Sequence, residues 1–177
     1  MDEAAIRTAA ASYMFDRLSK RGVTCLLTPM VWHGNGSLSR DLKRFVSLNP
    51  IRSFDPKFDS ELDYMDIEPD IVAICKIGSH ALTIVGECKS KGNLAVSNLA
   101  QVLLYSTVSK ATAGAMFFTG SPTRPVKKIL DDEVLVYRGY DRHRILKEKM
   151  IGFYQYERAG SFEKLWPQTY DVLDLSS

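Results

Sequence analysis

The sequence predicts an α/β fold in which helices flank a mixed central sheet. Three observations predict it: an alanine-rich helical segment comes first, three β-prone runs follow, and a second helical segment then leads to a short apolar strand. The order of these elements is αβββαβ. With 177 residues, 45% hydrophobic and 25% charged, the chain has the size and composition of one globular domain. We expect that domain to span residues 1–177, with a core at about 2–120 and an extension at about 121–177.

The first helix is predicted over residues 2–20. This segment is rich in alanine, and Gly22 follows it as a stop signal. Apolar side chains recur near helical spacing at Ile6, Ala10, Tyr13 and Leu18. The next run, VTCLLTPMVW at 23–32, predicts a strand, in which Pro29 indicates an edge position or a strand end.

A long connection follows, at residues 33–68, with one apolar patch at 42–48 that could form a small helix. Long connections are often functional. We interpret His33 as a surface residue, with a functional histidine as the alternative. Five acidic residues follow one another with no basic residue among them: Asp59, Glu61, Asp63, Asp66 and Glu68. We interpret them as a solvated loop, with ligands of a second metal or a first-strand carboxylate as the alternative.

The next segments are more regular. Residues 70–77 and 81–89 are β-prone runs separated by a short Gly78-Ser79 break, which is typical of an antiparallel hairpin. Residues 94–110 predict a helix, and residues 115–119 predict a buried strand. Three further elements are expected beyond them: a short helix at 126–130, a strand at 134–137 and an amphipathic element of uncertain type at 145–156.

The hairpin arranges three charged residues for chemistry. Side chains alternate along a strand, so Glu87 and Lys89 share one face. A turn centred on the Gly78-Ser79 break sets Asp70 opposite Glu87. Like charges that face each other across two strands are destabilising. A divalent cation between the two carboxylates would reverse the sign of that interaction.

Two carboxylates suit Mg²⁺, which takes one or two of them and keeps several waters. The backbone carbonyl of Cys88 could add a ligand. Such an ion lowers the pKa of bound water and stabilises charge on a phosphoryl group. Lys89, on the same face as Glu87, would orient the attacking water and neutralise the phosphate. The constellation therefore predicts a metal-dependent phosphodiesterase site.

The motif Pro69-Asp70 followed by Glu87-Cys88-Lys89 resembles that of the PD-(D/E)xK nuclease superfamily. Gln101 and Tyr105, in the context NLAQVLLY, are similar to the Q-x-x-x-Y motif of RecB-like nucleases, and their spacing puts both on one helical face. The stretches PDIVAI and VGECKS also resemble archaeal Holliday-junction resolvases.

The resemblance implies a restriction-endonuclease-like αβββαβ core and cleavage of DNA with Mg²⁺ or Mn²⁺. It implies catalytic roles for the motif residues and for Gln101 and Tyr105. Members of the superfamily commonly carry an acidic residue on the first helix, where Glu3 is the nearest candidate and Asp16 the other.

The net charge of +2 does not by itself indicate nucleic acid, so the distribution of charge has to be considered. Basic residues gather before the acidic run and again after the last core strand. The candidates for nucleic-acid binding are Lys91, Arg40, Lys43, Arg44, Arg124, Lys127 and Lys128. The alternative is an ordinary charged surface, because acidic residues are interspersed in the second cluster.

No apolar run is long enough to cross a bilayer, and the acidic start Met1-Asp2-Glu3 is unlike a secretory signal. The three cysteines lack a CxxC spacing, and each lies in a β-prone stretch, which favours neither a disulfide framework nor a metal cluster. We therefore expect a soluble, intracellular (cytoplasmic) protein without a membrane partner.

Three functions are compatible with these patterns. The first is a metal-dependent deoxyribonuclease acting on DNA that is single-stranded, duplex or branched. The second is a catalytically inactive DNA-binding or assembly subunit of the same fold. The third is a homodimeric Holliday-junction resolvase, since resolution requires two symmetric sites.

Overall fold

The computed structural model describes residues 2–19, 24–29, 69–77, 80–108, 111–131, 151–168 and 171–174. Its elements in chain order are α1 (Glu3–Leu18), β1 (Thr24–Pro29), β2 (Ile71–Ile77), β3 (His80–Lys89), α4 (Val96–Val108), β4 (Ala113–Phe118), α5 (Arg124–Asp131), β5 (Ile151–Tyr156) and β6 (Phe162–Trp166). The possible helix at 42–48 and the predicted strand at 134–137 lie outside the described residues.

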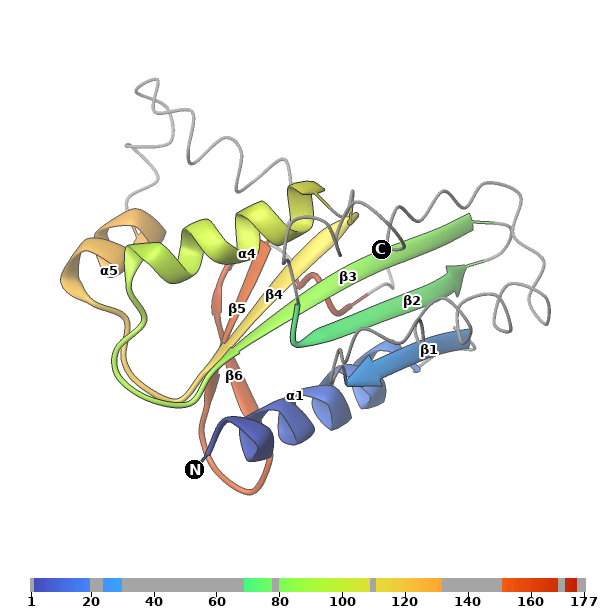
Figure 1. Cartoon of the computed structure of the whole chain (residues 1–177), viewed down its shortest axis with the longest axis horizontal. Coiled ribbons are helices and arrows are strands. Elements are labelled where there is room, and N and C mark those ends of the chain that lie inside the picture. The colour runs from blue at the N-terminus through green and yellow to red at the C-terminus, as the bar shows by residue number, and fades with distance from the viewer. Residues whose placement is uncertain are drawn as a thin grey trace.

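The strands form one mixed sheet in the order β1-β2-β3-β4-β5-β6. β1, β2 and β3 are antiparallel neighbours, whereas β3, β4 and β5 run parallel and β6 is antiparallel to β5 (Figure 1). The αβββαβ order and the mixed sheet are therefore confirmed. Among the described strands, β1 lies at an edge of the sheet, in agreement with the edge position that Pro29 indicated.

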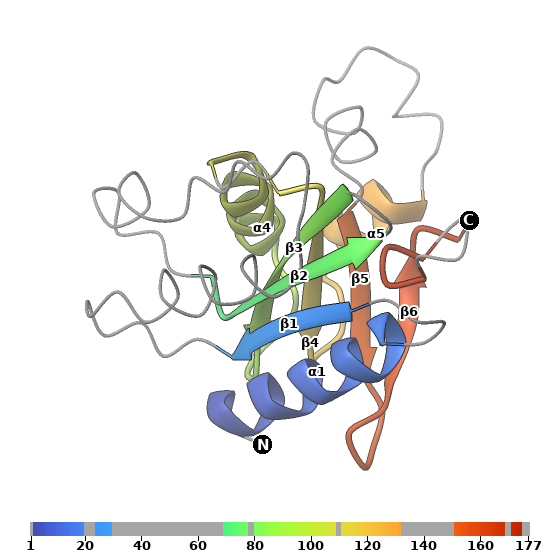
Figure 2. The same cartoon turned by 90° about the vertical axis from the view of Figure 1, so that its right-hand side faces the viewer.

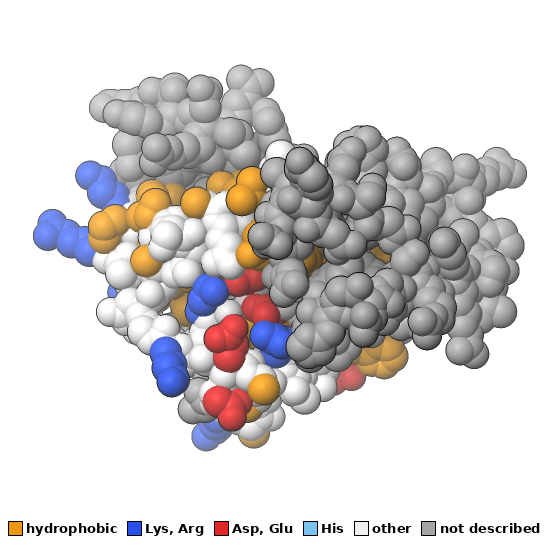
Figure 3. Space-filling view, in the orientation of Figure 1, with side chains coloured by type: hydrophobic (Ala, Val, Ile, Leu, Met, Phe, Trp, Pro, Cys, Tyr) orange, Lys and Arg blue, Asp and Glu red, His pale blue; other side chains and the backbone are white. Residues whose placement is uncertain are grey.

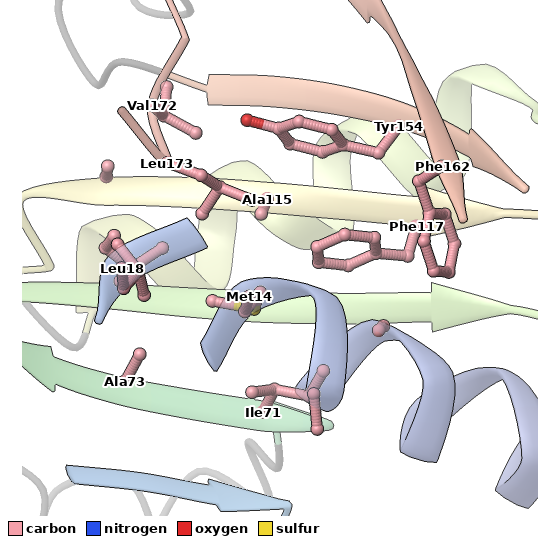
Figure 4. Packing of buried hydrophobic residues seen from close by; sticks show 14 of the residues in the cluster. Met14, Leu18, Ile71, Ala73, Ala115, Phe117, Tyr154, Phe162, Val172 and Leu173 are labelled. Atoms are coloured by element: carbon pink, nitrogen blue, oxygen red, sulfur yellow. The ribbon is translucent and has the colours of Figure 1, made fainter. Parts of the chain in front are cut away.

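Helices cover both faces of the sheet (Figures 1 and 2). α1 packs on the face that carries Ala73, Ala115, Phe117 and Tyr154, and these residues form one buried cluster with it. α4 and α5 pack on the other face, where a second cluster contains Met116, Phe118 and Phe153 among others. Figure 4 shows Met14 and Leu18 of α1 directed at the first of these faces.

α1 is fixed at both ends. The side chain of Asp2 caps the helix by accepting the N–H of Ala5 at 2.8 Å. Near the other end, Arg17 pairs with the carboxylate of Asp171. Asp171 also accepts the hydroxyl of Tyr154 at 2.6 Å, so the C-terminal residues join α1 to β5. No helix among the described residues is long and apolar enough to cross a membrane.

The hairpin of β2 and β3 has the predicted register. Ile77 pairs with His80, and the ladder continues to Ile71 opposite Gly86. Its alternation sends Ile71, Ala73 and Cys75 toward α1, because they belong to the cluster on that face. Burial of this apolar set fixes the register, since a slip of one residue would move it to the other face.

The amphipathic element expected at 145–156 was of uncertain type. Its described part is a strand, β5. β6 follows after a tight turn and pairs with β5. The predicted short helix at 126–130 is the larger part of α5. The region expected as an extension thus adds two strands to the sheet.

The segments that follow β3 and β4 are held together at Gly120. The N–H of Thr119 donates to the carbonyl of Lys89 at 3.1 Å, and the N–H of Leu94 donates to Ser121 at 3.0 Å. A Cβ atom added to Gly120 would lie 2.8 Å from the carbonyl carbon of Gly92 and would overlap its oxygen. The absence of a side chain at Gly120 is therefore what allows this close approach.

We predict that Gly120→Ala lowers the free energy of unfolding by about 1–3 kcal/mol, because two backbone segments must move apart. Urea unfolding followed by circular dichroism measures the effect. Ser121→Ala, an exposed neighbour, serves as the control and is expected to change stability by less than about 0.5 kcal/mol. Equal stability of the two variants would contradict the prediction.

Candidate active site

The predicted site lies where β3 continues past the start of β2. The last pair of their ladder on this side is Ile71 with Gly86, and Asp70 immediately precedes β2. The carboxylate oxygen Oδ2 of Asp70 accepts the N–H of Cys88 at 2.7 Å. The side chain of Asp70 therefore accepts the backbone N–H of Cys88, which lies beyond the last pair of the β2–β3 ladder. This contact holds the carboxylate against the end of β3.

Glu87 and Lys89 share one face of β3, as the alternation predicts. Lys89 Nζ lies 3.0 Å from Glu87 Oε1. The same oxygen accepts the side-chain amide of Gln101 at 2.7 Å, and that amide lies 2.9 Å from the hydroxyl of Tyr105. Gln101 thus reaches Glu87 from α4, and Tyr105 reaches the amide of Gln101.

Glu3 and Arg7 approach the site from α1. Arg7 Nη2 lies 2.7 Å from Asp70 Oδ1, and 3.6 Å from a carboxylate oxygen of Glu3. The side chain of Glu3 is 56% exposed, so it stands at the margin of the site, whereas the side chain of Asp70 is buried. Asp16, the other candidate on α1, is exposed near the far end of the helix.

The electrostatics of the two carboxyl groups are unusual. Burial and the negative charge of Asp70 together raise the pKa of Glu87 to about 7, against the opposing effect of Lys89. Burial also raises the pKa of Asp70, although the N–H of Cys88 and the charge of Arg7 lower it. The site therefore holds two neighbouring carboxyl groups in an environment that disfavours their charged forms.

The pKa values of Lys89 and Tyr105 are both raised, so both groups stay protonated. Burial by itself would lower the pKa of Lys89, but its contact with Glu87 and the charges of Asp70 and Glu3 outweigh this and raise it. Burial raises the pKa of Tyr105, with Glu87 adding to the effect. Lys89 is thus a cation and Tyr105 a neutral phenol at neutral pH.

One oxygen of Glu87 is left without a donor. Oε2 is buried, and within the described part of the chain no group donates a hydrogen bond to it. An unpaired buried carboxylate oxygen is costly, and a cation would remove that cost. Together with the carboxylate of Asp70, this oxygen belongs to a donor set that fits a hard divalent ion.

The described residues contribute two carboxylates to the predicted metal position, Asp70 and Glu87. Among the described residues, no group of three or more His, Cys, Asp or Glu side chains is arranged to hold a metal. Two carboxylates are within the number that Mg²⁺ usually takes from a protein while it keeps several waters.

The charged side chains of the site gather between α4 and the N-terminal part of α1 on the face shown in Figure 3. Lys91, in the segment that follows β3, is exposed. The basic residues of α5, which are Arg124, Lys127 and Lys128, are exposed as well. His33, Arg40, Lys43, Arg44 and the acidic run at 59–68 lie outside the described residues.

Sequence reasoning missed Arg7. It follows Glu3 by four residues, and this spacing places both on the same side of α1. Because Glu3 was a candidate site residue, this spacing indicated that Arg7 would lie near the site as well. It was not informative by itself, because such pairs are common on exposed helices.

The comparisons with known proteins found one similar structure and no similar sequence. No family model matches the sequence, and no curated protein has a similar sequence. A solved structure with a similar chain path is the pre-specific restriction endonuclease BsaWI in complex with DNA, at a TM-score of 0.47 and 11% sequence identity. The match covers 88% of this chain and 52% of that one, so this chain spans about half the length of that endonuclease. This degree of likeness does not bear on function.

Proposed function

We propose that this protein is a metal-dependent nuclease that hydrolyses phosphodiester bonds in DNA. The observation that carries the proposal is the pair of buried carboxylates, Asp70 and Glu87, with Lys89 in contact with Glu87. Asp70 is 8% and Glu87 4% exposed, and Glu87 Oε2 is the oxygen without a donor. Stability alone does not explain this arrangement, because two apolar residues at these buried positions would cost less free energy than two carboxylates.

Asp70 and Glu87 would hold Mg²⁺ or Mn²⁺, and the carbonyl of Cys88 is the third proposed ligand. In a strand, the N–H and C=O of one residue face the same neighbour, and the N–H of Cys88 faces Asp70. The carbonyl of Cys88 is therefore expected on the same side. When bound, the ion supplies a water of lowered pKa and stabilises negative charge on the phosphoryl group.

Lys89 provides the positive charge next to this position. Its pKa is raised, so it stays cationic, and its ammonium group can donate to a water and to a phosphate oxygen together. Its contact with Glu87 holds it on the same face as the proposed metal ligands. We propose that Lys89 orients the attacking water and offsets the charge that develops on the phosphate.

Gln101 and Tyr105 position Glu87. The amide of Gln101 donates to Glu87 Oε1, which leaves Oε2 as the oxygen available for a cation. Tyr105 lies beside the same amide and limits how it can turn. We propose that this pair fixes the rotamer of Glu87, with Glu3 contributing negative charge from the margin of the site.

The choice of DNA as the substrate rests on the resemblance of the motifs to the PD-(D/E)xK superfamily. Exposed basic residues are the proposed phosphate contacts, with Lys91 beside the site and Arg124, Lys127 and Lys128 on α5. Such contacts fix the position of the backbone and read no sequence.

We predict that Glu87→Gln weakens Mn²⁺ binding at least about tenfold, because half of the carboxylate pair is lost while the shape of the side chain is kept. Isothermal titration of Mn²⁺ into the purified chain measures this. Glu163→Gln is the matched control, since Glu163 is exposed on β6, and it is expected to bind like the wild type.

Three results would count against the proposal. Mn²⁺ binding that is equal in Glu87→Gln and wild type would remove Glu87 from the metal site. A folded wild-type protein that binds no Mn²⁺ would remove the site altogether. Binding of DNA and Mn²⁺ without cleavage of single-stranded, duplex or branched DNA would favour the inactive DNA-binding subunit instead.

A further inference from the structure

Arg7 brings a permanent positive charge to the proposed metal site. Its guanidinium nitrogen lies 2.7 Å from Asp70 Oδ1, and its side chain is 23% exposed. The partner carboxylate is buried, so this is not a solvated surface pair. An arginine does not lose its proton in a protein, so the charge is present at every working pH.

We propose that Arg7 is an internal counter-cation that holds Asp70 in position and lowers the affinity of the site for a divalent ion. The inference rests on the proposed function, since it concerns the metal held by Asp70 and Glu87. It assigns to Arg7 a positioning and tuning role, and none in the reaction itself.

The first argument is geometric. Both oxygens of Asp70 are engaged: Oδ2 accepts the N–H of Cys88 and Oδ1 faces Arg7. The carboxylate is therefore held between α1 and β3 before any ion arrives. Each oxygen still has a second lone pair, so a metal can bind, but it must bind beside a cation.

The second argument is the balance of charge. The described site contains three carboxylates, Glu3, Asp70 and Glu87, and two cations, Arg7 and Lys89. With all five groups ionised, the net charge is one negative. Loss of Arg7 would leave two negative charges, and the attraction for a divalent ion grows with that charge, most of all where water is largely excluded.

A simple structural role for Arg7 predicts the opposite effect of its removal. If the contact only kept Asp70 in place, loss of the contact would misplace the ligand and weaken metal binding. If Arg7 competes with the ion, loss of its charge strengthens binding. Metal affinity therefore separates the two roles.

The test is calorimetric titration of Mn²⁺ into the full chain at neutral pH and fixed ionic strength. Arg7→Met removes the charge and keeps an unbranched side chain, and we expect it to bind Mn²⁺ at least about tenfold more tightly than the wild type. Arg7→Lys keeps the charge and is expected to stay within about threefold of the wild type. Arg158→Met, in the exposed turn between β5 and β6, controls for the loss of an arginine elsewhere.

Thermal unfolding confirms that each variant is folded, and Arg7→Gln replaces Arg7→Met should the latter not fold. Mn²⁺ affinity of the charge-removing variant that is equal to or weaker than that of a binding-competent wild type would overturn the inference and leave the proposed function standing. A folded wild type that binds no Mn²⁺ would defeat the proposed function, and the inference with it.

Discussion

Lys89→Ala is expected to abolish metal-dependent cleavage of DNA, which means a fall in rate of at least about 100-fold. Losses of this size follow when one preorganised group that stabilises charge in the transition state is removed. The reason is the position of Lys89 Nζ, 3.0 Å from Glu87 and on the face where the proposed metal ligands lie. The alanine removes both the donor to the attacking water and the positive charge beside the phosphate.

The loss should be confined to the chemical step. DNA binding is measured in Ca²⁺, which uses the same kind of oxygen ligands, and is expected to stay within about threefold of the wild type, because one contact among many phosphate contacts is removed. Mn²⁺ affinity should not fall either, since the variant loses a neighbouring positive charge.

Lys76→Ala, a partly exposed lysine on β2 at the end remote from Asp70, is the matched control and should cleave normally. Cleavage by purified Lys89→Ala protein at the wild-type rate would show that Lys89 has no part in the reaction.

Phe117→Ala is expected to lower the free energy of unfolding by about 3–5 kcal/mol, the usual cost of replacing a buried phenylalanine by alanine. Phe117 is fully buried, and its ring stacks on Tyr154 at 5.1 Å and meets Phe162 edge-on at 5.0 Å. Tyr13 of α1 completes the group. The cavity would therefore open at the contact between α1 and the sheet.

Urea unfolding measures the free energy, and the melting temperature should fall by about 10 °C for a chain of this length. Phe15→Ala is the control, because that phenylalanine is on α1, which packs on the same face of the sheet, but is 47% exposed. The control should cost less than about 0.5 kcal/mol, as exposed substitutions usually do. Equal losses in the two variants would mean that the aromatic group does not anchor α1.

Much of the site could be predicted because it depends on short-range rules. The hairpin break at residues 78 and 79 and the alternation of β3 together fix which side chains face each other. The spacing of Gln101 and Tyr105 in one helix likewise places both on one side of α4. The hairpin geometry follows from the position of one turn and the two-residue period of a strand. The geometry of Gln101 and Tyr105 follows from the period of a helix.

The rest could not be predicted because it depends on how elements pack. The contact of Arg7 with Asp70 joins α1 to the start of β2, and nothing in either segment specifies the other. Asp70 was expected as a paired strand residue, but β2 begins at Ile71 and the Asp70 side chain accepts a backbone N–H instead. The strand β6 is short and only partly buried, so its pattern was too weak to predict.

The register of the β2–β3 hairpin has a consequence for how the chain can change over generations. Its pairing, from Ile77 with His80 to Ile71 with Gly86, sets both the apolar face under α1 and the charged face under α4. An insertion or deletion of one residue within β3 would reverse the two faces downstream of it, sending Glu87 and Lys89 into the core. Length changes in this strand are therefore coupled to loss of the site.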